Sequence, residues 1–143
     1  MKKFLLPIIA SVLLLAGCSE KAHIITHYYT VNSNQWERSI TTYEDGTYTT
    51  NYYYSTWENS DITPDVINDG VVLVYYLDND GRDNILPYTL YLSDNGVNYQ
   101  ERIEYDIEPG KITFKIKDSD FNTDQSMQQI GTMKFKVSVI ANF

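Results

Sequence analysis

Cysteine and histidine are scarce in this sequence of 143 residues, which has one cysteine, Cys18, and two histidines, His23 and His27. A single cysteine cannot form a disulfide within the chain or supply the cysteine pairs of a typical zinc site. The sequence also lacks a glycine-rich phosphate loop and the strand-turn-helix serine motif of hydrolases. We therefore expect neither a catalytic residue nor a cofactor.

Basic residues are also few, because 11 Lys and Arg face 19 Asp and Glu, which gives a formal net charge of -8. An acidic domain repels the phosphate backbone, and charge of this sign commonly serves solubility. We expect no nucleic-acid partner.

The N-terminal segment carries the most specific motif. Two lysines precede an apolar run over residues 4–15, which ends in Leu15-Ala16-Gly17-Cys18. The run has the length of a signal-peptide core and is shorter than the roughly 20 residues of a membrane-spanning helix. The motif resembles the bacterial lipobox, in which a peptidase cuts before a cysteine whose sulfur has received a diacylglyceryl group. The resemblance implies a lipoprotein signal peptide over residues 1–17 and a membrane anchor at Cys18.

The resemblance also bears on localisation and domain boundaries. Ser19 stands where inner-membrane lipoproteins of well-studied bacteria have aspartate. The resemblance therefore favours an anchor in the outer membrane, and the domain could lie on either the periplasmic or the outer face of that membrane. Residues 18–25 are expected to be the lipidated cysteine and a tether. Residues 26–143 are about the size of one domain with one core.

Apolar residues recur at every second position through most of the chain, as in β-strands with one buried face. The clearest case surrounds Glu108-Pro109-Gly110-Lys111, where proline and glycine favour a tight turn. With a two-residue loop, the predicted register pairs Glu108 with Lys111, Tyr105 with Phe114 and Glu104 with Lys115.

The same pattern predicts about eight strands, near residues 24–31, 40–43, 47–57, 71–77, 88–92, 97–107, 112–116 and 133–139. Asn95-Gly96 and Asp45-Gly46 are the expected turns of two further hairpins. One helical turn is expected near residues 63–68, because Thr63 is a suitable N-cap and Pro64 suits the first helical position. For residues 122–131 the sequence is compatible with either a short helix or a loop. The predicted fold is a single antiparallel β-sandwich, immunoglobulin-like or similar.

The segment Val71–Leu77, VVLVYYL, is apolar on both faces. A strand in a sandwich normally shows one face to water. We expect this chain to cover the outer face, through residues 62–69 or the tether, and the alternative is a contact with another chain.

Tyrosine is abundant, with 13 residues, and the segment Asn51–Trp57 reads NYYYSTW. Alternation puts Tyr53 and Trp57 on one face of a strand and Tyr52 and Tyr54 on the other. The favoured interpretation has the first pair in the core and the second pair half exposed. The alternative is a ligand platform made by Tyr52 and Tyr54, with Tyr28 or Tyr91.

A metal site has little support. His23 and His27 on a strand would lie about 13 Å apart. Asp118, Asp120, Asn122 and Asp124 alternate like the first half of a calcium loop, yet Thr123 and Gln129 replace the glycine and the glutamate that such a loop needs. Calcium is therefore only an alternative to a solvated turn.

Several segments together resemble small Bacteroidota lipoproteins that have one β-sandwich domain and no assigned function. The resemblance rests on Leu15–Cys18, Ile62-Thr63 with Val66, Gly70–Tyr75, Leu86-Pro87 and Phe135–Ile140. It implies an envelope lipoprotein and no catalytic residues. We expect a binding or structural module for a glycan or an envelope protein, and the alternative is an enzyme or an accessory subunit of an envelope enzyme.

Overall fold

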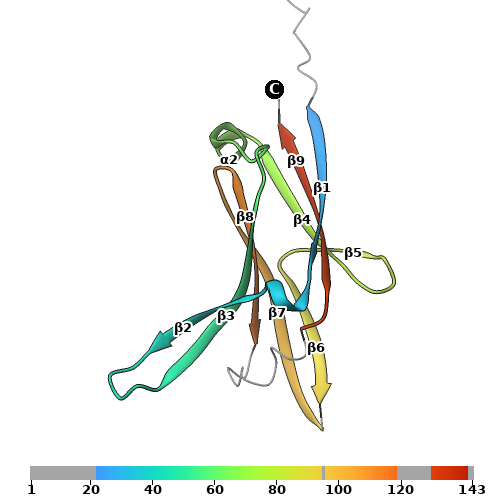
Figure 1. The fold of residues 1–143 in the computed structure, drawn as a ribbon. Coiled ribbons are helices and arrows are strands. Elements are labelled where there is room, and N and C mark those ends of the chain that lie inside the picture. The colour runs from blue at the N-terminus through green and yellow to red at the C-terminus, as the bar shows by residue number, and fades with distance from the viewer. Residues whose placement is uncertain (1–21, 95, 119–129, 142–143) are drawn as a thin grey trace, which may run out of the picture.

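The computed structural model describes residues 22–94, 96–118 and 130–141 as two antiparallel sheets packed face to face (Figure 1). The prediction of an all-β sandwich is confirmed. The described chain has nine strands rather than about eight, because the three-residue strand Asp83–Ile85 is too short to show a period. None of its helices is long and apolar enough to cross a membrane.

The four-stranded sheet has the order β1-β9-β4-β5, and the five-stranded sheet has the order β2-β3-β8-β7-β6. The strand bounds are β1 His23–Val31, β2 Glu37–Thr42, β3 Tyr48–Glu58, β4 Val71–Leu77, β5 Asp83–Ile85, β6 Tyr88–Asp94, β7 Val97–Glu108, β8 Lys111–Asp118 and β9 Met133–Ala141. Two short helices complete the fold, η2 Ser33–Gln35 and α2 Pro64–Asp69. β1 begins at His23, inside the range expected to be tether.

The β7–β8 hairpin has the register that the sequence predicted. Glu108 pairs with Lys111, Tyr105 with Phe114 and Glu104 with Lys115. Gly110 has φ of 79°, which a residue with a side chain rarely adopts. A two-residue turn and the alternation of apolar side chains therefore suffice to determine this register.

Helix α2 forms where the sequence predicted a helical turn. The Thr63 hydroxyl accepts a hydrogen bond from the Val66 N–H, and Pro64 occupies the start of the helix. Val66 is buried in the core, together with Ile62 from the preceding loop. This segment thus closes one end of the sandwich (Figure 1).

The prediction that residues 62–69 cover the outer face of β4 is therefore wrong. Val72, Val74 and Tyr76 point inward and pack in or against the core, while Val71 on the outer face is 49% exposed. The tether that could have provided the alternative cover lies outside the described residues, except for its last four.

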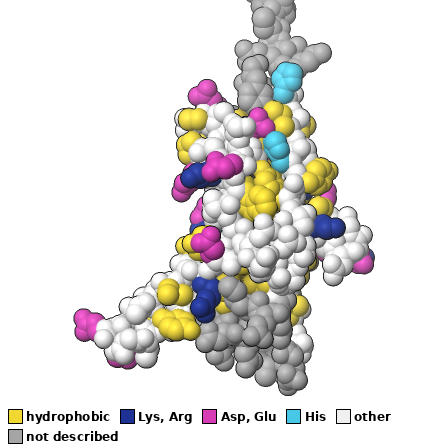
Figure 2. Space-filling view, in the orientation of Figure 1, with side chains coloured by type: hydrophobic (Ala, Val, Ile, Leu, Met, Phe, Trp, Pro, Cys, Tyr) yellow, Lys and Arg dark blue, Asp and Glu magenta, His cyan; other side chains and the backbone are white. Residues whose placement is uncertain are grey.

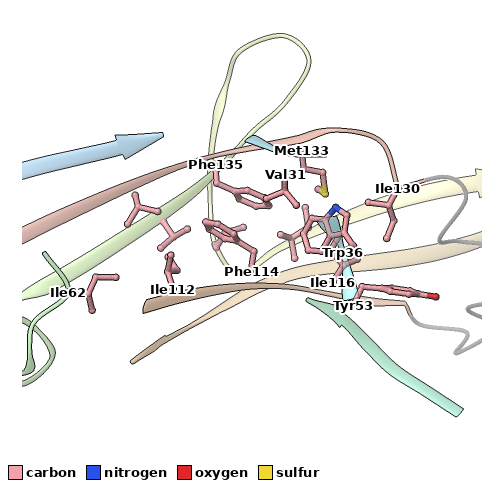
Figure 3. Close-up of a cluster of buried hydrophobic side chains, with 14 of the residues drawn as sticks. Val31, Trp36, Tyr53, Ile62, Ile112, Phe114, Ile116, Ile130, Met133 and Phe135 are labelled. Carbon is pink, nitrogen blue, oxygen red and sulfur yellow. The ribbon is translucent and has the colours of Figure 1, made fainter. Parts of the chain in front are cut away.

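The core joins the two sheets through aromatic contacts (Figure 3). Phe114 of β8 stacks on Phe135 of β9, with ring centroids 4.0 Å apart and an interplanar angle of 9°. Tyr29 of β1 meets Phe114 and Trp57 edge to face, at 5.6 Å in each case. Because these rings come from four strands in both sheets, their burial aligns the sheets.

Of residues 122–131, for which the sequence predicts either a short helix or a loop, only the last two are described. Ile130 is buried in the core. Met127 and the rest of the predicted loop or helix lie outside the described residues.

Gly70 lies where α2 comes close to β9, and a substitution there tests how close this approach is. A Cβ atom built there would lie 2.8 Å from the carbonyl oxygens of Ile140 and Val66. Gly70→Ala should lower the free energy of unfolding by about 1–3 kcal/mol, as overpacking does, measured by urea denaturation. Gly131→Ala is the control, because its Cβ would meet nothing within 4 Å. Equal stability of the two variants would contradict the close approach.

Candidate ligand-binding surfaces

The segment NYYYSTW divides between the two faces of β3 as its alternation predicted. Tyr53 is 1% exposed and lies in the core, and Trp57 packs against that core. Tyr52 and Tyr54 are half-buried on the outer face. Trp36 is buried against Phe135.

The rings of Tyr52 and Tyr54 do not form a flat platform. Their centroids are 6.0 Å apart and their planes are inclined at 62°, so a single planar face of a ligand cannot stack on both. The Lys115 ammonium lies 5.1 Å from the centroid of the Tyr52 ring. The Tyr54 hydroxyl donates a 2.9 Å hydrogen bond to Glu37 Oε2, and this bond raises the pKa of Tyr54.

Charged pairs surround these tyrosines on the outer face of the five-stranded sheet. Glu104 accepts ion pairs from Arg102 at 2.6 Å and Lys117 at 2.9 Å, and Lys115 pairs with Asp106. Lys115 therefore bonds diagonally, although Glu104 is its direct cross-strand neighbour. Each pair joins one exposed and one half-buried side chain. Ion pairs that face solvent in this way contribute little individually, and their arrangement is that of a solvated sheet face.

Tyr91 lies in a different setting, at the far edge of the same sheet. Its side chain is 78% exposed. It helps to line an open depression of about 360 Å³, together with Leu92, Ser93, Asn98, Tyr99 and Gln100. The β6–β7 register places Tyr91 opposite Gln100 and Ser93 opposite Asn98. An exposed aromatic ring thus has hydroxyl and amide groups beside it.

The four predicted tyrosines do not share one surface. Tyr91 is separated from Tyr52 and Tyr54 by β8 and β7, a distance of roughly 14 Å across the sheet. Tyr28 lies on the outer face of the other sheet and is 71% exposed.

Ser93, Asn98 and Gln100 were not among the residues predicted to lie beside Tyr91. The signal was present in Asn95-Gly96, because a two-residue turn there defines the pairing of the two strands.

The histidines lie in β1 and do not share a site (Figure 2). His27 Nε2 is 2.7 Å from Asp61 Oδ2, in the loop that precedes α2. Next to it, the Asn59 side chain donates to the Tyr29 hydroxyl. These contacts attach the loop to β1. The described residues contain no group of three or more side chains arranged to hold a metal ion.

Of the alternative calcium ligands, only Asp118 is described, and Asp120, Asn122 and Asp124 lie outside the described residues. Asp118 is directly opposite Glu101 in the β7–β8 pairing. Burial, and secondarily the charge of Asp118, raise the pKa of Glu101 above its ordinary value of 4.5.

No known protein family matches the sequence, and no curated protein or solved structure matches it either.

The Glu101–Asp118 pair predicts how stability depends on pH. Because the pKa of Glu101 is raised in the folded state, the native protein holds this proton more tightly than the unfolded chain does. The contribution of Glu101 to stability therefore falls as the pH rises above about 4.5. Glu101→Gln should stabilise the fold at pH 7 by roughly 0.2–1 kcal/mol, the range for cross-strand pairs. Thermal melts at pH 7 and pH 3.5 measure this, and the gain should vanish at the lower pH.

Glu104→Gln is the matched control on the same strand. It removes an acceptor of two ion pairs, so it should give no gain at pH 7. A lower melting temperature for Glu101→Gln than for the native protein at pH 7 would contradict the assigned cost of the Glu101 charge, which arises from burial and from Asp118.

Proposed function

We propose that this protein is a lipid-anchored binding module of the bacterial cell envelope, and that its ligand is a glycan held at the Tyr91 depression. The observation that carries the glycan assignment is the exposed Tyr91 ring beside Ser93, Asn98 and Gln100. The anchor assignment is supported by the lipobox resemblance at Leu15–Cys18.

The chemistry of the depression suits a sugar. The apolar face of a pyranose packs on an aromatic ring, and its hydroxyls exchange hydrogen bonds with amide and hydroxyl side chains. A volume of about 360 Å³ lies at the lower end of the range for small-ligand sites. The lining groups are aromatic, amide, hydroxyl and aliphatic, which favours binding over acid–base chemistry.

The proposed anchor sits close to the folded domain. Four residues lie between Cys18 and His23, where β1 begins, so the connection is five Cα–Cα steps long. A fully extended chain of that length spans at most about 18 Å. A lipid on Cys18 would therefore hold this end of the sandwich near the outer membrane, on whichever face the protein resides.

Ligand binding is tested by thermal shift with a panel of envelope and plant glycans. A ligand at a hundredfold its Kd stabilises the native state by about 2.7 kcal/mol, which raises the melting temperature by several degrees. Tyr91→Ala should weaken binding at least about tenfold, a loss of about 1.4 kcal/mol.

Tyr28→Ala is the matched control for this experiment, because Tyr28 is similarly exposed but lies on the other sheet. A glycan shift that survives Tyr91→Ala and disappears in Tyr52→Ala or Tyr54→Ala would move the site to β3. Absence of a shift with every glycan would refute a glycan ligand.

The anchor is tested by mass spectrometry of the protein isolated from a bacterial envelope. The native chain should begin at Cys18 and carry the added mass of a diacylglyceryl group. Cys18→Ala should abolish both the modification and the cleavage, so residues 1–17 remain attached. An unmodified native Cys18 would show that the lipobox resemblance is misleading.

A further inference from the structure

The outer faces of the two sheets differ in chemistry. The five-stranded sheet has ion pairs on its outer face, whereas the four-stranded sheet presents mostly apolar side chains. Cross-strand pairing aligns Ile24, Ile140 and Val71 in one row. A second row contains Tyr28, Lys136, Tyr75 and Ile85. Ile24, Tyr28, Val71 and Ile85 are each about half or more exposed.

Few charges lie on this apolar face, because the outward-facing positions of its four strands carry only Lys134, Lys136 and Asp83. Lys136 forms an ion pair with Asp83, and its ammonium lies 4.4 Å from the centroid of the Tyr75 ring. Asp83 is the only acidic residue at the outward-facing positions of the four strands. In a chain with a formal net charge of -8, this face has an unusually small share of the acidic groups.

The same sheet ends in a long strand edge, which contacts the loop before α2 through the side chains of His27 and Tyr29 but pairs with no second strand among the described residues. β1 pairs with β9 over nine residues in an unbroken register, and its other edge has no neighbouring strand among the described residues. Its sequence, HIITHYYTV, contains no Lys, Arg, Asp, Glu or Pro. Natural edge strands are usually short, irregular or charged, because an open edge pairs with other chains.

The other edge strands have such protection. β5 has three residues. β2 carries Glu37 and Arg38, and its pairing with β3 is interrupted by a bulge. β6 follows Pro87 and ends at Asp94. Among the described strands, β1 is therefore the edge best suited to pair with a further strand.

We propose that β1 pairs antiparallel with β1 of a second copy, so that two four-stranded sheets become one continuous eight-stranded sheet. A two-fold contact of this kind uses the same edge on both partners. Two acidic chains repel each other over most of their surfaces, and β1 with its adjoining apolar face is where that repulsion is weakest. The pairing leaves Tyr91 accessible, because β6 belongs to the other sheet, and it does not require the lipid anchor.

Cysteine cross-linking in the full chain tests the pairing. Thr26→Cys, His27→Cys and Tyr28→Cys are introduced singly, because a residue on the two-fold axis lies opposite its own copy. Cells are treated with a diffusible oxidant, so the result does not depend on the compartment, and dimers are identified on non-reducing gels. At least one of the three variants should form a disulfide-linked dimer in high yield.

Two controls define the background. Thr56→Cys is exposed on the outer face of the other sheet and should give only collisional dimer. The native chain shows any dimer formed through Cys18, which would indicate failure of the lipidation proposal rather than of the pairing. Adding Lys at a neighbouring exposed β1 position, such as Thr30→Lys, should abolish the specific dimer.

Two results would overturn the proposal. One is a dimer yield at all three β1 positions no higher than at Thr56→Cys. The other is a cross-linked product whose mass is not twice that of the chain, which would show that β1 pairs with a different protein. Because Thr26 and Tyr28 are exposed, these two substitutions leave the core intact, and resistance of the monomers to trypsin confirms folding.

Discussion

Packing of the two sheets against each other is the constraint on which the rest of this structure depends. A chain with one cysteine has no disulfide to hold the layers together, so the buried side chains must do so. The Phe114–Phe135 stack lies at the centre of this contact, with Tyr29 and Trp57 beside it. Burial of such large rings supplies a major part of the hydrophobic stabilisation in a small domain. It also sets which side chains remain on the outer faces.

The two outer faces suit different partners. The five-stranded sheet has charged pairs over its centre and an exposed ring with amide neighbours at its edge, an arrangement suited to a hydrated ligand. The four-stranded sheet has an apolar face and an open edge strand, which suit another protein surface. Because these surfaces belong to different layers, the proposed glycan and the proposed second copy do not compete for the same residues.

Much of the candidate site could be predicted from the sequence. Tyr91 was a candidate, and the Asn95-Gly96 turn implies that Gln100 lies opposite it, as the structure shows. The separation of Tyr91 and Tyr28 from Tyr52 and Tyr54 was not predictable, because it depends on strand order within and between the sheets. Likewise, Tyr52 contacts Lys115 and Tyr54 contacts Glu37, and both partners belong to other strands.

The sequence by itself determined the features that arise from neighbouring residues. The alternation of apolar and polar residues determined which face of each strand is buried. Pro109-Gly110 determined the β7–β8 register, and Thr63 with Pro64 determined where α2 begins. Tertiary structure alone decided contacts between residues far apart in the chain, such as His27 with Asp61 and Phe114 with Phe135. The physical reason is that local patterns specify which side of a strand is apolar, whereas the partner of that side is selected by packing the whole core.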